Sequence, residues 1–189
     1  YRQSRNVLLD SLMNQYMRLS LLGGTGDIGK GLALRFAADT DHDVIIGSRD
    51  PDKAHSAAES YEQTLAEHGH EAKITGFENP MAADRADCVV LAVPPYHVTD
   101  TLSSVVSRLS DDAVIITPAA GLTRDEDGFH YRPPSAGSVT TLVADAAPES
   151  NPVVGAFHNL AAGRLADLSL ELGIDTLVLG DDRNATEMI

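Results

Sequence analysis

The sequence predicts an α/β fold in which a doubly wound, mainly parallel sheet carries helices on both faces. From Met17 onward, short apolar runs alternate with longer stretches that suit helices, which is the pattern of strands joined by crossover helices. The run 88–93 is apolar at every position, as expected of a strand buried on both faces. A glycine-rich turn separates the first expected strand from the first expected helix.

The elements follow in order along the chain. Strands are expected at residues 18–23, 43–47, 72–76, 87–93, 113–117, 152–157 and 175–179. Helices are expected at 28–38, 52–68, 96–109, 138–146 and 159–170. The segment 123–137, rich in charged residues, glycine and proline, is expected to form a long loop.

The two ends are expected to differ from the rest. Residues 1–16 precede a methionine that stands next to the first strand, so we interpret them as an extension or a cloning remnant. Residues 17–189 are expected to form one domain and the start of a C-terminal part. That part is expected to be truncated, because a further helix starts near the last residue, Ile189.

Composition excludes several classes of protein. A formal net charge of −14 disfavours a nucleic-acid surface, which needs clustered cations. No apolar run approaches the ~18 residues of a membrane span, and without a signal-peptide pattern the cytoplasm is the expected compartment. The single cysteine, Cys88, lies in an apolar run and is assigned no chemistry. Few lysines and many aspartates resemble the composition of proteins from salt-loving archaea.

The glycine-rich turn carries the most specific motif. Gly24, Gly26 and Gly29 form G-x-G-x-x-G between a strand and a helix, the dinucleotide-binding pattern of Rossmann-type domains. Gly24 is expected to permit the tight turn, Gly26 to let a pyrophosphate approach the backbone, and Gly29 to let helix and strand pack closely. The helix that begins near Asp27 would present its free N–H groups to the anion. The alternative is a purely structural turn.

The residues after the second strand indicate which dinucleotide binds. NAD-binding domains usually place an acidic residue there for the ribose 2′-hydroxyl. This chain has Ser48 and Arg49, whose hydroxyl and guanidinium groups attract a 2′-phosphate, and Lys53 adds a charge one helical turn later. Asp50 and Asp52 keep NAD open as an alternative, although acidic residues are also favoured at a helix start. The sequence therefore favours NADP.

Three loops at the carboxyl ends of strands are expected to complete the site. Residues 93–97, 117–121 and 157–162 contain several alanines, which leave room for flat ring systems. His97 and His158 are the titratable side chains in these loops, so either is a candidate acid or base, with a packing role as the alternative. The remaining histidines lack the spacing of a metal site.

The segment from Leu22 to Arg35, followed by Gly47-Ser48-Arg49, resembles the NADPH-dependent coenzyme F420 reductases. The resemblance extends through residues 74–76, 92–94 and 180–182. It implies direct hydride transfer between NADP and the deazaflavin coenzyme F420, without a metal. It also implies a homodimer when the chain is full-length, with a C-terminal part that contributes to the deazaflavin site and the dimer.

The resemblance also implies roles for particular residues. The pyrophosphate would be held by Thr25, Gly26, Asp27 and Ile28. The 2′-phosphate would be held by Ser48, Arg49 and Lys53. The rest of the NADP site would be lined by Val93, His97, Ala120 and Ala162, with His158 near the two rings.

The chain departs from the family at two positions, and two other functions remain as alternatives. Family members often have a proline where this chain has Ala161 and an aromatic residue where it has Pro95, so the pocket is expected to differ in shape there. One alternative is another NADP-dependent reductase, of the imine or pyrroline-carboxylate type, which would need a proton donor. The other is an NADP-sensing protein without turnover.

Overall fold

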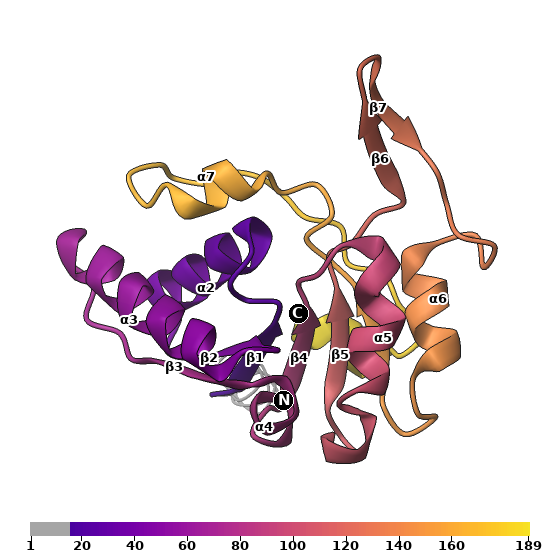
Figure 1. The fold of residues 1–189 in the computed structure, drawn as a ribbon, viewed down its shortest axis with the longest axis horizontal. Coiled ribbons are helices and arrows are strands. Elements are labelled where there is room, and N and C mark those ends of the chain that lie inside the picture. Colours follow the sequence, from indigo (N-terminus) through magenta and orange to yellow (C-terminus); the bar gives the residue numbers. More distant parts are fainter. Residues whose placement is uncertain (1–15) are drawn as a thin grey trace, which may run out of the picture.

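Six parallel strands form the centre of the computed structural model, which describes residues 16–189 (Figure 1). Their order across the sheet is β3-β2-β1-β4-β5-β8, so the order reverses between β1 and β4. The expected α/β, Rossmann-type class is confirmed. The strands are β1 (Arg18–Leu22), β2 (Asp43–Ser48), β3 (Ile74–Glu78), β4 (Cys88–Leu91), β5 (Val114–Thr117) and β8 (Val153–Gly155).

Helices cover both faces of this sheet because successive residues of each strand point to opposite faces. Val44 and Ile46 pack into one hydrophobic cluster, whereas Ile45 packs into the other. The first cluster is covered by α2 (Asp27–Asp39), α3 (Pro51–Glu67), α7 (Ala162–Ala166) and α8 (Arg183–Met188). The second is covered by α4 (Asn79–Asp84), α5 (Val98–Ser103) and α6 (Val139–Ala146).

Three expectations about the elements need correction. The helix expected at 96–109 is broken into two 3₁₀ turns, η1 (Pro95–His97) and η2 (Val106–Arg108), with α5 between them. The helix expected at 159–170 is limited to α7, and the short α4 was not expected at all. The strand expected at 175–179 is wrong: only Leu179 pairs with Gly155, through an isolated bridge. Leu177 is 78% exposed, so apolar composition there does not reflect burial.

The expected loop at 123–137 contains a β-hairpin instead. Strand β6 (Leu122–Asp125) pairs antiparallel with β7 (Gly128–Tyr131), and the hairpin projects from the body of the molecule (Figure 1). Gly128 has a φ of +117°, a conformation open to glycine that allows the chain to reverse within a short tip. The tip of the hairpin is charged and contains glycine, so its sequence looks like a loop. For that reason the two short strands were not predicted.

The segment after β8 packs against α2 and is held there by hydrogen bonds. A Cβ atom at Gly31 would lie 2.6 Å from the Cβ of Leu165, so only glycine lets α7 approach this closely. The Arg35 side chain donates hydrogen bonds to the carbonyl oxygens of Leu165 and Leu170, each at 2.9 Å. The bond to Leu165 satisfies a carbonyl group that the end of the short helix α7 leaves without a partner. The second half of the chain is thereby positioned on the first.

The structure does not test every expectation about the ends. Residues 1–15 lie outside the described residues, and the expected N-terminal extension falls there apart from Tyr16. Within residues 16–189, no helix combines the length and apolar character that crossing a membrane requires.

We expect Gly31→Ala to lower the free energy of unfolding by about 1–3 kcal/mol, because the added methyl group forces α7 away from α2. Gly163→Ala is the matched control, because nothing lies within 4 Å of a Cβ atom there. The control should be neutral or stabilising by up to about 1 kcal/mol. Urea unfolding of the three proteins measures both effects. Equal effects of the two substitutions would contradict the close approach.

Candidate functional site

The loops predicted to form the site meet at one edge of the sheet. The connections that follow β1, β2, β4, β5 and β8 all start at the carboxyl ends of parallel strands. The order of the strands reverses between β1 and β4, and open α/β sheets bind ligands at such a switch point. The fold therefore brings the residues singled out in the sequence to a common edge.

The turn between β1 and α2 depends on backbone contacts that only glycine permits. Gly23 has a φ of +79°, so the left-handed residue is Gly23 and not Gly24, to which the sequence assigned the tight turn. A Cβ atom at Gly24 would lie 2.7 Å from the carbonyl oxygen of Leu21. One at Gly29 would lie 2.6 Å from the Cα atom of Gly24, which agrees with close packing of helix and strand.

Gly26 differs from these glycines. A Cβ atom there would meet only the carbonyl oxygen of Gly23, at an ordinary contact distance of 3.4 Å. The protein itself therefore leaves open space over Gly26. That space lies directly at the start of α2, where a ligand would meet the backbone.

The N-terminus of α2 is free to receive an anion. No side chain caps this helix, whose N-cap residue is Gly26. Lys30 donates its backbone N–H to Gly26 at 2.8 Å, so the N–H groups of the preceding turn point out of the helix end. The hydroxyl of the buried Tyr61 donates to the carbonyl oxygen of Gly24 at 3.0 Å and holds the turn in place. Burial raises the pKa of Tyr61, which keeps this hydroxyl protonated.

The residues after β2 lie at the start of α3. Ser48 is 8% exposed, and its hydroxyl oxygen accepts from the backbone N–H of Asp50 at 3.2 Å. Asp50 caps α3 by accepting from the N–H groups of Asp52 and Lys53, at 3.1 and 3.3 Å. The interpretation of Asp50 as a residue of the helix start is confirmed. Arg49 is exposed at this corner.

Lys53 lies beside Asp50, the N-cap residue of α3, the helix that contains Lys53. Its Nζ atom is 4.0 Å from the Oδ2 atom of Asp50, and both side chains are largely exposed. This exposed pair contributes little to stability, so the ammonium group can exchange Asp50 for another anion. The structure thus places Ser48, Arg49 and Lys53 together at one end of α3.

The loop after β4 touches the glycine turn. A Cβ atom at Gly23 would lie 2.5 Å from the Cγ1 atom of Val93, so Val93 packs against the turn. Beyond it, His97 is exposed, and its ring lies 4.5 Å from that of Tyr96. The predicted residue Val93 is therefore adjacent to the turn, whereas His97 lies on a surface corner of η1. In the next loop, Ala120 is half-buried.

The loop after β8 contains a strained residue next to His158. Phe157 has a φ of +66°, which costs a side-chain-bearing residue about 1–3 kcal/mol. Its backbone N–H donates to the Thr176 hydroxyl at 3.2 Å, and its ring packs edge-on against Phe36 at 5.7 Å. Thr176 also donates to the Asn159 side chain at 3.0 Å. Sequence reasoning missed Thr176 because nothing in its neighbourhood along the chain marks it.

His158 lies over the end of the sheet. A Cβ atom at Gly155 would be 2.9 Å from the Cε1 atom of this imidazole, so the missing side chain of Gly155 makes room for the ring. Burial lowers the pKa of His158 below its ordinary value. The ring is therefore neutral at pH 7, so one of its nitrogens donates a hydrogen bond and the other accepts one. Ala162 begins α7 a few residues further on.

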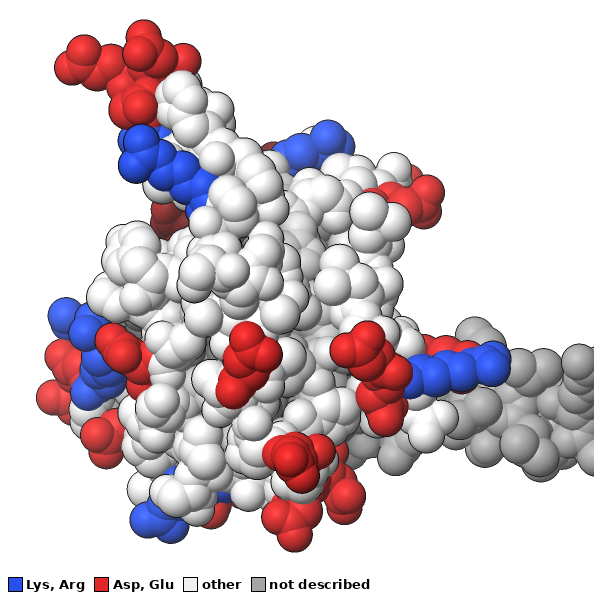
Figure 2. Space-filling view, turned by 90° about the vertical axis from the view of Figure 1, so that its right-hand side faces the viewer, with Lys and Arg blue, Asp and Glu red and all other residues white. Residues whose placement is uncertain are grey.

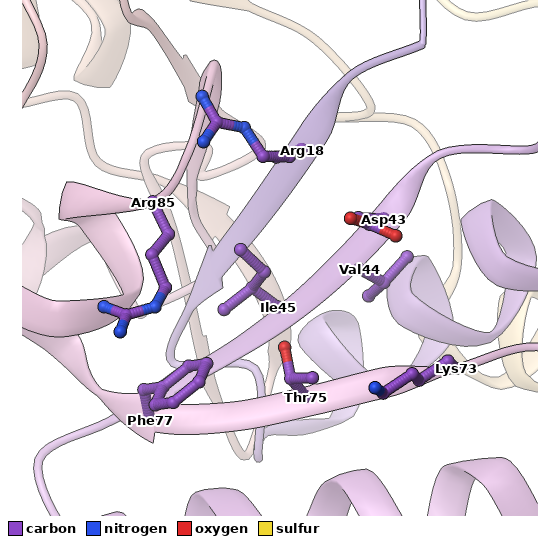
Figure 3. A pocket seen from close by; sticks show the side chains of 8 residues that line it. All are labelled: Arg18, Asp43, Val44, Ile45, Lys73, Thr75, Phe77 and Arg85. Atoms are coloured by element: carbon purple, nitrogen blue, oxygen red, sulfur yellow. The ribbon is translucent and has the colours of Figure 1, made fainter.

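Two other features lie away from this edge. A shallow cavity of about 360 Å³ lies beside the amino ends of β1 and β2, lined among others by Arg18, Phe77 and Arg85 (Figure 3). It contains no residue predicted for the site. Cys88 is fully buried, and burial raises the pKa of its thiol to about 11. Within residues 16–189, no three His, Cys, Asp or Glu side chains are grouped as a metal would require.

Comparisons with known proteins agree on one family. A family model described as NADP oxidoreductase, coenzyme F420-dependent, matches residues 18–121. The F420-dependent NADP reductase of Methanocaldococcus jannaschii is 37% identical over 175 residues, which are 92% of this chain and 77% of the relative. The enzyme of the same name from Methanothermobacter thermautotrophicus is 36% identical, over 91% of this chain and 74% of its own length.

Solved structures give the same picture. A crystal structure of a candidate F420-dependent NADP reductase from Arthrobacter sp. FB24 superposes with a TM-score of 0.68 at 25% identity. That match covers 89% of this chain and 76% of the other. A pyrroline-5-carboxylate reductase from Coxiella burnetii gives 0.50 at 20% identity, over 75% of this chain and 44% of its own, which shows a shared fold only.

We expect the free energy of unfolding to fall as the pH drops from about 6.5 through the lower pKa of folded His158. The unfolded imidazole takes up a proton in this window, whereas the half-buried ring of the folded protein takes it up only at lower pH. His158→Gln should remove this contribution and flatten the stability curve between pH 7 and 5. Urea unfolding at several pH values measures the slope. An NMR titration that finds the pKa of folded His158 above its value in urea would contradict the prediction.

Proposed function

The chain belongs to the coenzyme F420-dependent NADP oxidoreductases, and we propose that it transfers a hydride between NADP(H) and the deazaflavin coenzyme F420 at the carboxyl edge of its sheet. The relatives that share over a third of its residues carry this activity in their names. The observation that carries the proposal is the uncapped start of α2, together with the exposed Arg49 that follows the neighbouring strand β2. These two features supply a place for a pyrophosphate and for a second phosphate.

The pyrophosphate fits the turn between β1 and α2. Gly26 leaves open space where a side chain would otherwise stand, and the backbone N–H groups of Thr25, Asp27 and Ile28 lie at the free end of the helix. The positive end of the helix dipole adds attraction for an anion. No cationic side chain is needed at this point, because backbone donors and the dipole do the binding.

The 2′-phosphate of NADP fits the start of α3. Arg49 can form two parallel hydrogen bonds to a phosphate, Ser48 can donate one, and Lys53 adds a point charge. The carboxylate of Asp50 stays charged, but its Oδ1 atom accepts from two backbone N–H groups of α3 and its Oδ2 atom lies 4.0 Å from the Nζ atom of Lys53, so these neighbours offset part of its repulsion. The arrangement therefore favours NADP over NAD.

The rings are proposed to meet beyond Val93, Ala120, Ala162 and His158. The two cosubstrates supply the hydride donor and acceptor, so the protein has to hold their rings at about 3–3.5 Å. The small side chains of Ala120 and Ala162 leave space for flat rings. His158, neutral at pH 7, is placed to orient a ring by a hydrogen bond without adding charge.

The activity is tested directly by mixing the protein with NADPH and oxidised coenzyme F420 in a stopped-flow spectrophotometer. The acidic composition makes a series of salt concentrations necessary. Loss of the deazaflavin absorbance band together with NADPH oxidation would support the proposed reaction. Binding of NADPH without loss of that band at any salt concentration would overturn it and leave a protein that only binds the nucleotide.

We expect Arg49→Ala to raise the KM for NADPH about tenfold to a hundredfold, because a charge-assisted contact to phosphate contributes about 1.5–3 kcal/mol. The kcat should stay nearly constant, since the 2′-phosphate is bound equally in ground and transition states. The KM for NADH, which lacks that phosphate, should not change. Arg108→Ala, an exposed arginine in η2, is the control. An unchanged KM for NADPH in Arg49→Ala would rule out this residue as the selector.

A further inference from the structure

The backbone at Phe157 is held in a conformation that a side chain disfavours. Within residues 16–189 it is the only residue other than glycine with a positive φ, which is +66°. The Cβ atom is crowded in this left-handed region, so the conformation persists only where surrounding contacts hold it. Phe157 directly precedes His158. The backbone angles at Phe157 therefore set the direction in which the imidazole of His158 leaves the chain.

Thr176 is bonded to the loop on both sides of His158. Its hydroxyl oxygen accepts from the backbone N–H of Phe157 at 3.2 Å, and the same hydroxyl donates to the Oδ1 atom of Asn159 at 3.0 Å. The side-chain amide of Asn159 also donates to the carbonyl oxygen of Asp175 at 2.8 Å. Residues 157 and 159 are thus both tied to residues 175–176, and His158 is the residue between them.

The segment that contains Thr176 is itself joined to the sheet. Leu179 and Gly155, the last residue of β8, exchange two backbone hydrogen bonds at 2.8 and 2.9 Å. We call residues 175–179 the brace. Because the brace is bonded to β8 at one end and to the loop after β8 at the other, it fixes that loop relative to the sheet.

The imidazole of His158 lies in a notch that Gly155 leaves open. A Cβ atom at Gly155 would lie 2.9 Å from the Cε1 atom of His158. The same Cβ atom would lie 2.6 Å from the Oγ1 atom of Thr140 in α6 and 3.0 Å from the Cδ1 atom of Leu179 in the brace. The ring therefore shares the notch with one side chain from α6 and one from the brace.

Burial in this notch is the cause of the lowered pKa of His158, and no charged group among residues 16–189 contributes to it. Figure 2 shows a largely uncharged surface on the side of the molecule where α6 lies, below the projecting hairpin. The pKa of His158 therefore reports whether its ring lies in the notch or in solvent.

We propose that Thr176 is a positioning residue, whose hydroxyl holds the left-handed backbone of Phe157 and thereby keeps the imidazole of His158 in the notch at the carboxyl end of β8. The hydroxyl is required because one group has to accept a hydrogen bond and donate another. Without it, the backbone of Phe157 relaxes to a negative φ and the imidazole moves into solvent. The use of this orientation, contact with a bound ring, rests on the proposed function, whereas the orientation itself does not.

The first experiment measures the pKa of His158 by NMR titration, with His158→Gln to assign its signal. Thr176→Val keeps the shape of the side chain and removes both hydrogen bonds, so it should raise the pKa of His158 toward its ordinary value. Thr176→Ser retains the hydroxyl and should leave the pKa lowered. Thr64→Val is the matched control, because the half-buried Thr64 hydroxyl donates to the Ser60 carbonyl oxygen of its own helix, α3. The control should leave the pKa of His158 unchanged.

The second experiment measures hydride transfer from NADPH to oxidised coenzyme F420. Thr176→Val should lower kcat about tenfold to a hundredfold, because a displaced contact to the ring impairs alignment of the two reacting atoms. The KM for NADPH should stay constant, since the phosphate contacts at α2 and α3 are untouched. Thr176→Ser should restore most of the kcat. This division between kcat and KM is the reverse of that expected for Arg49→Ala.

Two NMR results would overturn the proposal: a pKa of His158 that stays lowered in folded Thr176→Val, or a pKa that rises equally in Thr176→Ser. If Thr176→Val does not fold, Asn159→Ala replaces it, because it unties the exposed side of the same loop and should raise the pKa in the same direction. An unchanged pKa there would overturn the proposal as well.

The kinetic results separate this proposal from the proposed reaction. No turnover in the unaltered protein would contradict the reaction, while the NMR titration would still decide whether Thr176 positions His158. Turnover with an unchanged kcat in Thr176→Val, despite a raised pKa, would overturn the use of the orientation in the reaction.

Discussion

The predicted nucleotide site depends on close contacts between backbone atoms in the turn that joins β1 to α2. The left-handed Gly23 turns the chain, and Gly24 then lies against Leu21 and Ile46. Gly29 brings the first turn of the helix onto Gly24. A side chain at any of these glycines would push α2 away from the sheet. The free N–H groups would then no longer face the edge at which the other loops end.

Neighbouring elements keep this turn in place. Val93, in the loop after β4, packs on Gly23, and the hydroxyl of Tyr61 in α3 donates to the carbonyl oxygen of Gly24. Both supports come from parts of the chain that border the proposed site themselves, since α3 starts at the residues proposed to bind the 2′-phosphate. The site behaves as one unit of packed backbone rather than as separate binding residues.

Sequence predicted the sheet well because burial repeats along each strand. The alternation of Val44, Ile45 and Ile46 between two cores requires apolar residues throughout, and that requirement is visible in the sequence. The segment 175–179 has similar composition without the burial, so the same reasoning was wrong there. The partnership of Thr176 with Phe157 and Asn159 is equally invisible, because it joins residues 17 and 19 positions apart without a periodic pattern.

The predicted site residues illustrate the same difference between local and distant signals. Gly24, Gly26 and Gly29 could be found because a turn must meet local steric demands, and those demands limit the choice of residue. The role of Gly23 was assigned to its neighbour, since both positions accept glycine and only the backbone angles distinguish them. The hairpin of β6 and β7 was not predicted for the opposite reason: its strands are short and its tip is charged, so its sequence lacks a strong pattern.

Electrostatics then accounts for how an acidic protein attracts an anionic ligand. The net charge of −14 opposes a dinucleotide at long range, but screening by salt reduces that repulsion over about 8–10 Å. At the proposed site, a bound dinucleotide would meet backbone N–H groups at the start of α2 and cationic side chains at the start of α3, where Asp50 caps the helix. Salt therefore lowers the general repulsion more than it weakens these short contacts.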